Sequence, residues 1–130
     1  MRVHHVGIAV LDLDQSIELY RSVFGAELLD RKANEKEGLE AAFMRMGDSE
    51  LELMAPMRED SPVGKFVARR GPGLHHVAYA VTDIRKALED ARASGLELID
   101  KEPRVGMHGG RIAFIHPKSA GGVLTELVEA

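Results

Sequence analysis

The sequence contains no cysteine, so disulfide bonds and thiolate chemistry are excluded, and any metal must be held by nitrogen and oxygen. It also lacks an apolar run of membrane-spanning length, and its first residues show no signal-like stretch. Lys and Arg are scattered and the net charge is −4, which argues against a nucleic-acid-binding surface. We therefore expect a cytoplasmic protein that binds neither membranes nor nucleic acids.

One pattern occurs twice in this chain of 130 residues, a length that suits a single domain. Residues 4–13 read HHVGIAVLDL and residues 75–84 read HHVAYAVTDI; residues 25–30 read GAELLD and residues 95–100 read GLELID. Each copy then reaches a strand-like segment with a glutamate, Glu52 in the first copy and Glu126 in the second. The repetition predicts a duplicated unit in which each copy supplies one histidine and one glutamate.

Each copy is expected to fold as β-α-β-β-β. Asp12 or Asp14 can cap a first helix that runs to about Phe24, and Asp83 can cap its counterpart, which Gly95 ends. Further strands are expected near residues 27–32, 39–46 and 50–55, and near 96–101, 111–115 and 123–129. The predicted fold class is α+β, in one domain over residues 1–130. Two tandem units, about residues 2–56 and 73–129 with a linking helix at about 61–71, form a curved eight-stranded mixed sheet. The helices lie on its convex side and a metal site on its concave side.

The faces of the first strand in each copy distinguish the two histidines of each doublet. Successive side chains of a strand point to opposite faces, so His5 and His76 share their faces with small residues only. Such a face leaves empty volume above it, as a ligand cavity needs. His4 and His75 are the alternative pair, but they lie with the bulky side chains that pack against other elements.

Glu52 has a neighbour, Glu50, on the same face of its strand, and this residue is an alternative ligand. Only Glu52 matches Glu126 in the repeat. Two imidazoles and two carboxylates suit Zn²⁺, Mn²⁺, Fe²⁺, Co²⁺ or Ni²⁺. With two ionised glutamates such a site is formally neutral, which limits the cost of burying it. An octahedral ion would keep two positions open for a chelating substrate.

Other polar residues are weaker candidates for the site. Glu40, at the start of a strand, is either a base near the metal or a solvated side chain. Lys118 and Ser119 lie in a turn that could hold an anionic group, and Arg111 is a further candidate substrate contact. Residues 106–110 read GMHGG, which is either a lid or a plain hairpin connection, and they contain no phosphate-binding pattern.

The paired His-Val strands, the repeat and the His/Glu set resemble the vicinal-oxygen-chelate, or glyoxalase-type, superfamily. The second half resembles most the methylmalonyl-CoA epimerase family within it. Residues 111–119 read RIAFIHPKS and residues 122–127 read GVLTEL, which is similar to the most characteristic run of that family. The resemblance extends over essentially the whole chain.

This resemblance implies a function and a division of roles. The reaction is metal-dependent epimerisation of (2R)- and (2S)-methylmalonyl-CoA, with removal of the proton next to the thioester and stabilisation of the enolate. The metal ligands fall on His5, Glu52, His76 and Glu126, with Co²⁺ expected and Mn²⁺, Ni²⁺ or Zn²⁺ as alternatives. Glu126 and Glu40 match the two catalytic glutamates, Glu40 only within one residue of alignment. The implied partners are an acyl-CoA substrate and a second copy of the chain.

Three other activities are open. Glyoxalase I uses a similar His/Glu set with a hemithioacetal of glutathione, but the run at residues 111–127 favours the epimerase. An extradiol dioxygenase needs two histidines and one glutamate around Fe²⁺, and a fourth ligand would obstruct oxygen. A metal-free binding protein of the same superfamily would lack the complete ligand set that this chain has.

Overall fold

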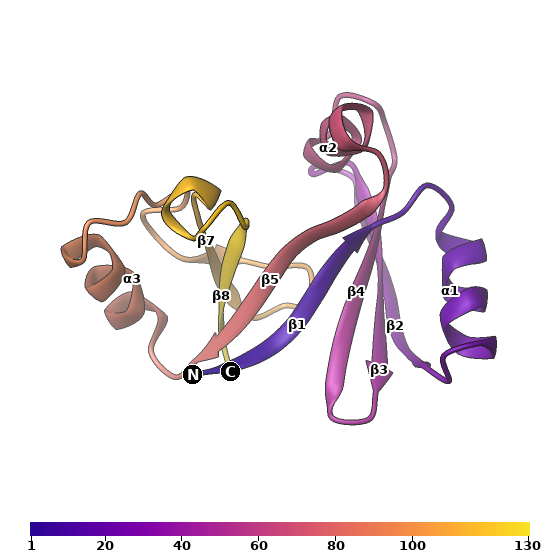
Figure 1. Cartoon of the computed structure of the whole chain (residues 1–130), viewed down its shortest axis with the longest axis horizontal. Coiled ribbons are helices and arrows are strands. Elements are labelled where there is room, and N and C mark those ends of the chain that lie inside the picture. The colour runs from indigo at the N-terminus through magenta and orange to yellow at the C-terminus, as the bar shows by residue number, and fades with distance from the viewer. The chain divides into compact units, whose positions relative to one another are not determined.

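The computed structural model describes all 130 residues and contains the β-α-β-β-β order twice (Figure 1). The first copy comprises β1 (Arg2–Ala9), α1 (Leu13–Ser22), β2 (Glu27–Asn34), β3 (Leu39–Met46) and β4 (Ser49–Pro56), and α2 (Pro62–Arg70) follows it. The second comprises β5 (Gly73–Val81), α3 (Ile84–Ala93), β6 (Arg104–Val105), β7 (Arg111–Ile115), a 3₁₀ turn (Pro117–Ser119) and β8 (Thr125–Glu129). The eight strands and three helices confirm the predicted fold class of tandem βαβββ repeats.

The contacts divide the chain into two compact units, residues 5–75 and residues 76–130 with residues 1–4. The boundaries fall inside β1 and β5 rather than in the linking segment. In the first unit the strand order is β2-β3-β4-β1, and in the second it is β6-β7-β8-β5. In both, the first strand of the copy pairs in parallel with the last one, and the remaining pairs are antiparallel. The two copies therefore share one topology.

Each helix begins at a polar cap. The Asp12 carboxylate accepts the backbone N–H of Gln15 at 2.9 Å, and the Asp83 carboxylate accepts that of Lys86 at 3.1 Å. These bonds satisfy backbone donors that the first turn of a helix leaves without an intrahelical acceptor. Gly25 and Gly95 follow α1 and α3 with φ of 71° and 88°, a left-handed conformation that favours glycine. The sequence prediction of Asp12, Asp83 and Gly95 as helix boundaries is confirmed.

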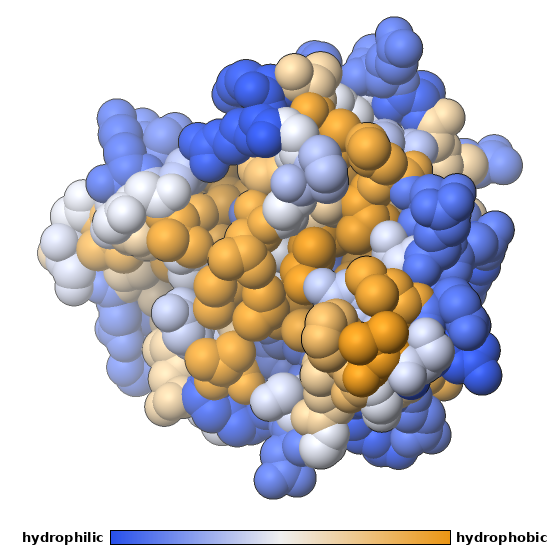
Figure 2. All heavy atoms as spheres, turned by 45° about the vertical axis from the view of Figure 1, so that its right-hand side comes forward, coloured by the Kyte–Doolittle hydropathy of each residue, from blue (hydrophilic) through white to orange (hydrophobic).

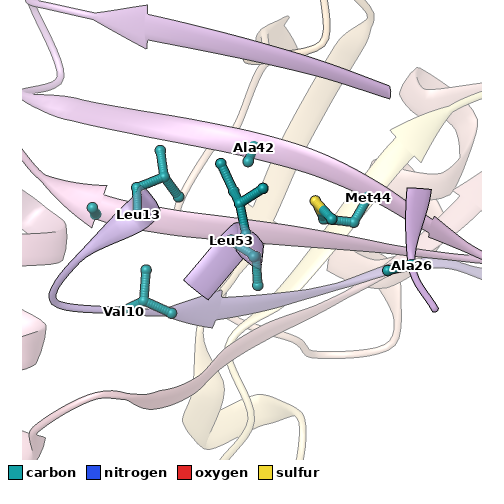
Figure 3. Close-up of a cluster of buried hydrophobic side chains, with 8 residues drawn as sticks. Val10, Leu13, Ala26, Ala42, Met44 and Leu53 are labelled. Atoms are coloured by element: carbon teal, nitrogen blue, oxygen red, sulfur yellow. The ribbon is translucent and has the colours of Figure 1, made fainter. Parts of the chain in front are cut away.

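Each unit buries one face of its strands under its own helix. In the first unit, Leu53 of β4 lies between Leu13 of α1 and Met44 of β3 in one buried cluster (Figure 3). Ile84 and Leu88 of α3 cover β7 and β8 in the same way in the second unit. The first of these cores comprises Val10, Leu13, Ile17, Ala26, Ala42, Met44, Leu53 and Ala55. Because strand side chains alternate, the opposite face of each sheet is left for other purposes.

The strand predicted at residues 96–101 is wrong. Only a single bridge, between Leu98 and Ile115, remains there, and the short strand β6 lies further on. The backbone N–H groups of both Ile99 and Asp100 donate to the carbonyl of Phe114, at 2.9 and 3.1 Å. The Phe114 N–H in turn donates to the Asp100 carboxylate at 2.9 Å. A side chain thus replaces a backbone acceptor, which interrupts the regular ladder.

No helix of the protein combines the length and the apolar character that are needed to cross a lipid bilayer.

Candidate metal centre

His5 and Glu52 meet on one face of the first unit. In the parallel pair of β1 and β4, Glu52 lies opposite Gly7, so His5 is the next residue along the same face. Glycine in this position leaves the glutamate side chain room to turn toward the imidazole. The His5 Nε2 and Glu52 Oε1 atoms are 3.4 Å apart, and the two residues are only 4% and 5% exposed. An imidazole nitrogen and a carboxylate oxygen are therefore held close together and away from water.

The second unit repeats this pair in the same register. Glu126 of β8 lies opposite Ala78 of β5, and His76 is the next residue on that face. The His76 Nε2 and Glu126 Oε1 atoms are 3.0 Å apart, and both residues are buried. A small residue again stands where glycine stands in the first unit. The small residue two positions after each histidine thus leaves room for the glutamate on the neighbouring strand.

The alternative residues of the sequence analysis have other surroundings. The ring of His75 packs edge-on against Phe66 at 4.8 Å between centroids, and the ring of His4 lies 5.7 Å from that of His108. Glu50 pairs across the β3–β4 hairpin with Arg45. The structure therefore brings His5 together with Glu52 and His76 with Glu126, and it gives His4, His75 and Glu50 different neighbours.

The donor set fits a divalent cation. A ligand distance of about 2.1 Å places neighbouring ligand atoms about 3.0 Å apart in an octahedron and about 3.4 Å apart in a tetrahedron. The two His–Glu separations, 3.0 and 3.4 Å, lie at these values. Each pair is buried and has an imidazole nitrogen and a carboxylate oxygen that could bind such an ion.

Two phenylalanines, which the sequence analysis missed, line this face. Phe43 of β3 lies directly opposite Glu52, and Phe114 of β7 lies directly opposite Glu126. The Phe114 ring meets His76 edge-to-face, with 5.7 Å between centroids and 86° between planes. A signal was present, because Ala-Phe recurs at residues 42–43 and 113–114 with the spacing of His5 and His76. An aromatic residue is therefore the strand neighbour of the glutamate in each pair.

Comparisons with known proteins give the site a family. The sequence model of the glyoxalase/bleomycin resistance protein/dioxygenase superfamily matches residues 4–114. The chain belongs to this superfamily. The ethylmalonyl-CoA/methylmalonyl-CoA epimerase of Cereibacter sphaeroides is 34% identical over 128 residues, which cover 97% of this chain and 96% of the relative.

A solved structure agrees with this result. It is a variant of the Streptomyces coelicolor methylmalonyl-CoA epimerase in complex with 2-nitronate-propionyl-CoA. It is 42% identical to the chain and has a TM-score of 0.94, with 98% of this chain and 93% of that one covered. A probable lactoylglutathione lyase of Vibrio cholerae is similar at a lower level, 28% identical over 128 residues, with 98% and 90% covered.

Glu40, which the superfamily resemblance matched to a second base, does not lie beside either pair. It is opposite Ala55 of β4, a residue of the core under α1, whereas Phe43 is opposite Glu52. Glu40 and Glu52 therefore point to opposite faces of the sheet. A displacement of one residue along a strand reverses the face of a side chain, and the resemblance places Glu40 only within one residue. Ala41, which is fully buried, occupies the face of Glu52 instead.

Glu40 takes part in an ion-pair network on the face of the sheet that α1 covers. The Arg31 Nε and Nη2 donate to its two carboxylate oxygens at 3.0 and 3.1 Å, and Arg31 also binds Asp14 of α1. The hydrogen bonds to Glu40 and then Asp14 raise the pKa of Arg31 above its ordinary value. Glu40 thus fastens the start of α1 to the sheet.

Exchanging Glu40 for glutamine is expected to leave proton transfer unchanged. Glu40→Gln should keep the rate of α-proton exchange with methylmalonyl-CoA within about 3-fold of wild type. It should lower the free energy of unfolding by about 1 kcal/mol or less, as is usual for exposed ion pairs. Deuterium exchange and urea unfolding measure the two effects. A loss of exchange of about 100-fold, typical of removing a general base, would restore Glu40 to the mechanism.

The three candidate substrate contacts also have structural partners. Arg111 donates to Glu129 Oε1 at 2.8 and 2.6 Å. Glu129 accepts the N–H of Ile84 at the start of α3, and this bond, followed by that from Arg111, holds its pKa below the ordinary value. Ser119 Oγ accepts the N–H of Glu97 at 2.9 Å, and Lys118 Nζ lies 3.2 Å from the Glu97 carboxylate. None of these contacts involves a His–Glu pair, so their roles toward substrate stay predictions.

Proposed function

We propose that this protein epimerises methylmalonyl-CoA at its α-carbon with the help of a divalent metal ion. The observation that carries the proposal is the buried His–Glu pair that recurs in the same register in both halves. The Cereibacter sphaeroides and Streptomyces coelicolor relatives, which match essentially the whole chain at 34% and 42% identity, have methylmalonyl-CoA epimerase in their names, which supports the same substrate class.

In this proposal His5, Glu52, His76 and Glu126 bind one shared ion. Two carboxylates balance its charge, which makes the buried site formally neutral. Nitrogen and oxygen ligands suit Co²⁺, which we propose, and also Mn²⁺, Ni²⁺ and Zn²⁺. A bound ion would supply Lewis-acid polarisation of the substrate thioester and carboxylate oxygens. The protein itself would hold the α-carbon of the substrate beside a side chain that accepts its proton.

Glu126 is the proposed acceptor of the α-proton. Its carboxylate is buried, it lies beside His76, and Phe114 stands opposite it on the neighbouring strand. Burial strengthens electrostatic interactions and limits proton exchange with water during the reaction. Epimerisation also needs a proton donor on the other side of the α-carbon, and the position of Glu40 does not support that role.

Deuterium uptake tests this function directly. The protein is treated with a chelator, reloaded with Co²⁺ and incubated with methylmalonyl-CoA in deuterium oxide. We expect label at carbon 2 and interconversion of the two epimers with the ion, and neither without it. Absence of label with Co²⁺, Mn²⁺, Ni²⁺ and Zn²⁺ alike would rule the epimerase out. A parallel assay with methylglyoxal and glutathione tests lactoylglutathione lyase activity, which the similarity to the Vibrio cholerae protein makes the second candidate.

We also propose that the protein forms a homodimer. Apolar side chains are exposed on the face drawn in Figure 2. The first unit exposes the large apolar residues Leu11, Leu19, Val23 and Phe24, which are 48–67% accessible. Exposed apolar clusters of this kind commonly mark protein interfaces. Light scattering coupled to size exclusion reports the mass in solution. The cytoplasmic location stays a prediction.

A further inference from the structure

Arg104 lies over an aromatic ring that itself touches the second His–Glu pair. Its guanidinium carbon is 5.5 Å from the centre of the Phe114 ring. The same ring meets His76 edge-to-face at 5.7 Å. One phenylalanine therefore separates a permanent cation from a candidate metal ligand. Arginine stacks in this way on aromatic faces because its planar guanidinium is weakly hydrated.

Strand pairing places Arg104 on the face of the sheet that carries Glu126. Arg104 of β6 is opposite Ile112 of β7, and Ile112 is opposite Val128 of β8. Phe114 is opposite Glu126 on the same two strands, two residues away from Ile112 and Val128 respectively. Because residues two apart share a face, Arg104, Phe114 and Glu126 all project from one side.

Asp100 holds the guanidinium in place. Its Oδ1 atom accepts from the Arg104 Nε at 3.2 Å, while its Oδ2 atom accepts the backbone N–H of Phe114 at 2.9 Å. The Asp100 side chain is 17% exposed, whereas that of Arg104 is 44% exposed. The arginine is thus oriented by a largely buried carboxylate and a ring, yet a solute can reach it.

A second arginine in the same unit shows what an ordinary surface ion pair looks like. Arg85 binds Glu102 at 2.7 Å, and the two side chains are 64% and 76% exposed. Ion pairs of this kind contribute little to stability. Arg104 differs in having a largely buried partner, an aromatic ring beneath its guanidinium and a place beside the candidate site.

We propose that Arg104 recognises an anionic group of the substrate, which is either the acyl carboxylate or a phosphate of coenzyme A. This assignment rests on the proposed function. Guanidinium binds both groups through paired, charge-assisted hydrogen bonds. An acyl-CoA is strongly anionic and the protein has a net charge of −4, so a cation on the ligand-binding face offsets their mutual repulsion. Arg104 is in this view a residue for binding and specificity, and it takes no part in proton transfer.

The test compares Arg104→Gln with Arg85→Gln, a matched change at the ordinary ion pair. Arg104→Gln should raise KM for methylmalonyl-CoA by about 10- to 100-fold, the range expected when a charged hydrogen bond is lost. Its kcat should stay within about 3-fold of wild type, and its metal content and melting temperature should match those of Arg85→Gln. Arg104→Lys keeps the charge without the planar fork and should recover part of the loss. Equal KM values for the two glutamine variants would overturn the assignment, as would loss of metal from Arg104→Gln.

The source of the anion follows from a shortened substrate. Methylmalonyl-pantetheine lacks the phosphates, so a KM difference that persists with it identifies the carboxylate, and one that disappears identifies a phosphate. Calorimetric binding of methylmalonyl-CoA in the presence of Co²⁺ provides a readout that does not depend on turnover. If the wild type binds but does not turn over, the proposed function fails while Arg104 is still tested. If both glutamine variants bind as tightly as the wild type, the Arg104 assignment fails on its own.

Discussion

His76→Ala is expected to abolish binding of the divalent ion and, with it, all α-proton exchange. The imidazole is buried and lies 3.0 Å from the Glu126 carboxylate, and the alanine side chain has no donor atom for a metal ion. Removing only an outer partner of a metal ligand already costs about 10- to 100-fold in affinity, and losing the ligand itself should cost more than about 100-fold. Elemental analysis and Co²⁺ titration measure the loss.

His75→Ala is the matched control for this change. The two histidines are adjacent on β5 but point to opposite faces, and the His75 ring packs edge-on against Phe66. His75→Ala should bind one equivalent of Co²⁺ and keep its activity. Both variants should retain the far-UV circular dichroism of the wild type, because truncating a single side chain costs about 0.5–3 kcal/mol in most cases. One equivalent of tightly bound metal in His76→Ala would refute the ligand assignment.

Glu126→Gln should lower the rate of α-proton exchange by about 10²- to 10⁴-fold, which is the usual contribution of a general base. Glutamine has the size of glutamate and retains an oxygen that can contact a cation, but it cannot accept the proton. The bound metal should therefore stay near one equivalent per chain while exchange falls. Single-turnover deuterium uptake separates this effect from any change in product release.

Glu52→Gln makes the same change at the equivalent position of the first copy. Glu52 and Glu126 have the same register relative to their histidines and the same burial, so both substitutions remove one charge from the candidate site. If Glu126 alone accepts the proton, Glu52→Gln should lose no more than about 10-fold, as a change in charge at a ligand allows. Equal losses in the two variants would show that Glu126 acts only as a ligand.

Much of the fold followed from two regularities of the sequence. The alternation of small and bulky residues around His5 and His76 indicated which face carries the candidate ligands, because successive side chains of a strand point to opposite faces. Asp12 and Asp83 marked helix starts because their side chains bond the exposed N–H groups of the first turn. These features are local, so a sequence contains them directly.

The features that were not predicted depend on strand register and on contacts between strands, which the sequence does not determine to the residue. Glu40 was assigned through an alignment uncertain by one residue, and one residue decides between the two faces of a strand. The contact between Phe114 and Arg104 joins β7 to β6. The strand β6 has only two residues, which is too short for a periodic pattern to reveal it. No strand forms at residues 96–101 because the Asp100 carboxylate accepts a backbone N–H in place of a backbone carbonyl. Strand propensity does not account for hydrogen bonds of this kind.

The irregular segment beside β7 has a consequence for how the two duplicated copies could diverge. In the first copy the corresponding edge is the eight-residue strand β2, which pairs with β3 along its length apart from one register shift between Leu28 and Asp30. In the second copy, Glu97, Ile99 and Asp100 meet the hydrogen-bonding needs of β7 and the residue after it individually. Length and composition can therefore drift on this side without unravelling the sheet. Arg104 and the loop after it can therefore change for new ligands during evolution, while the first copy keeps its strand pairing.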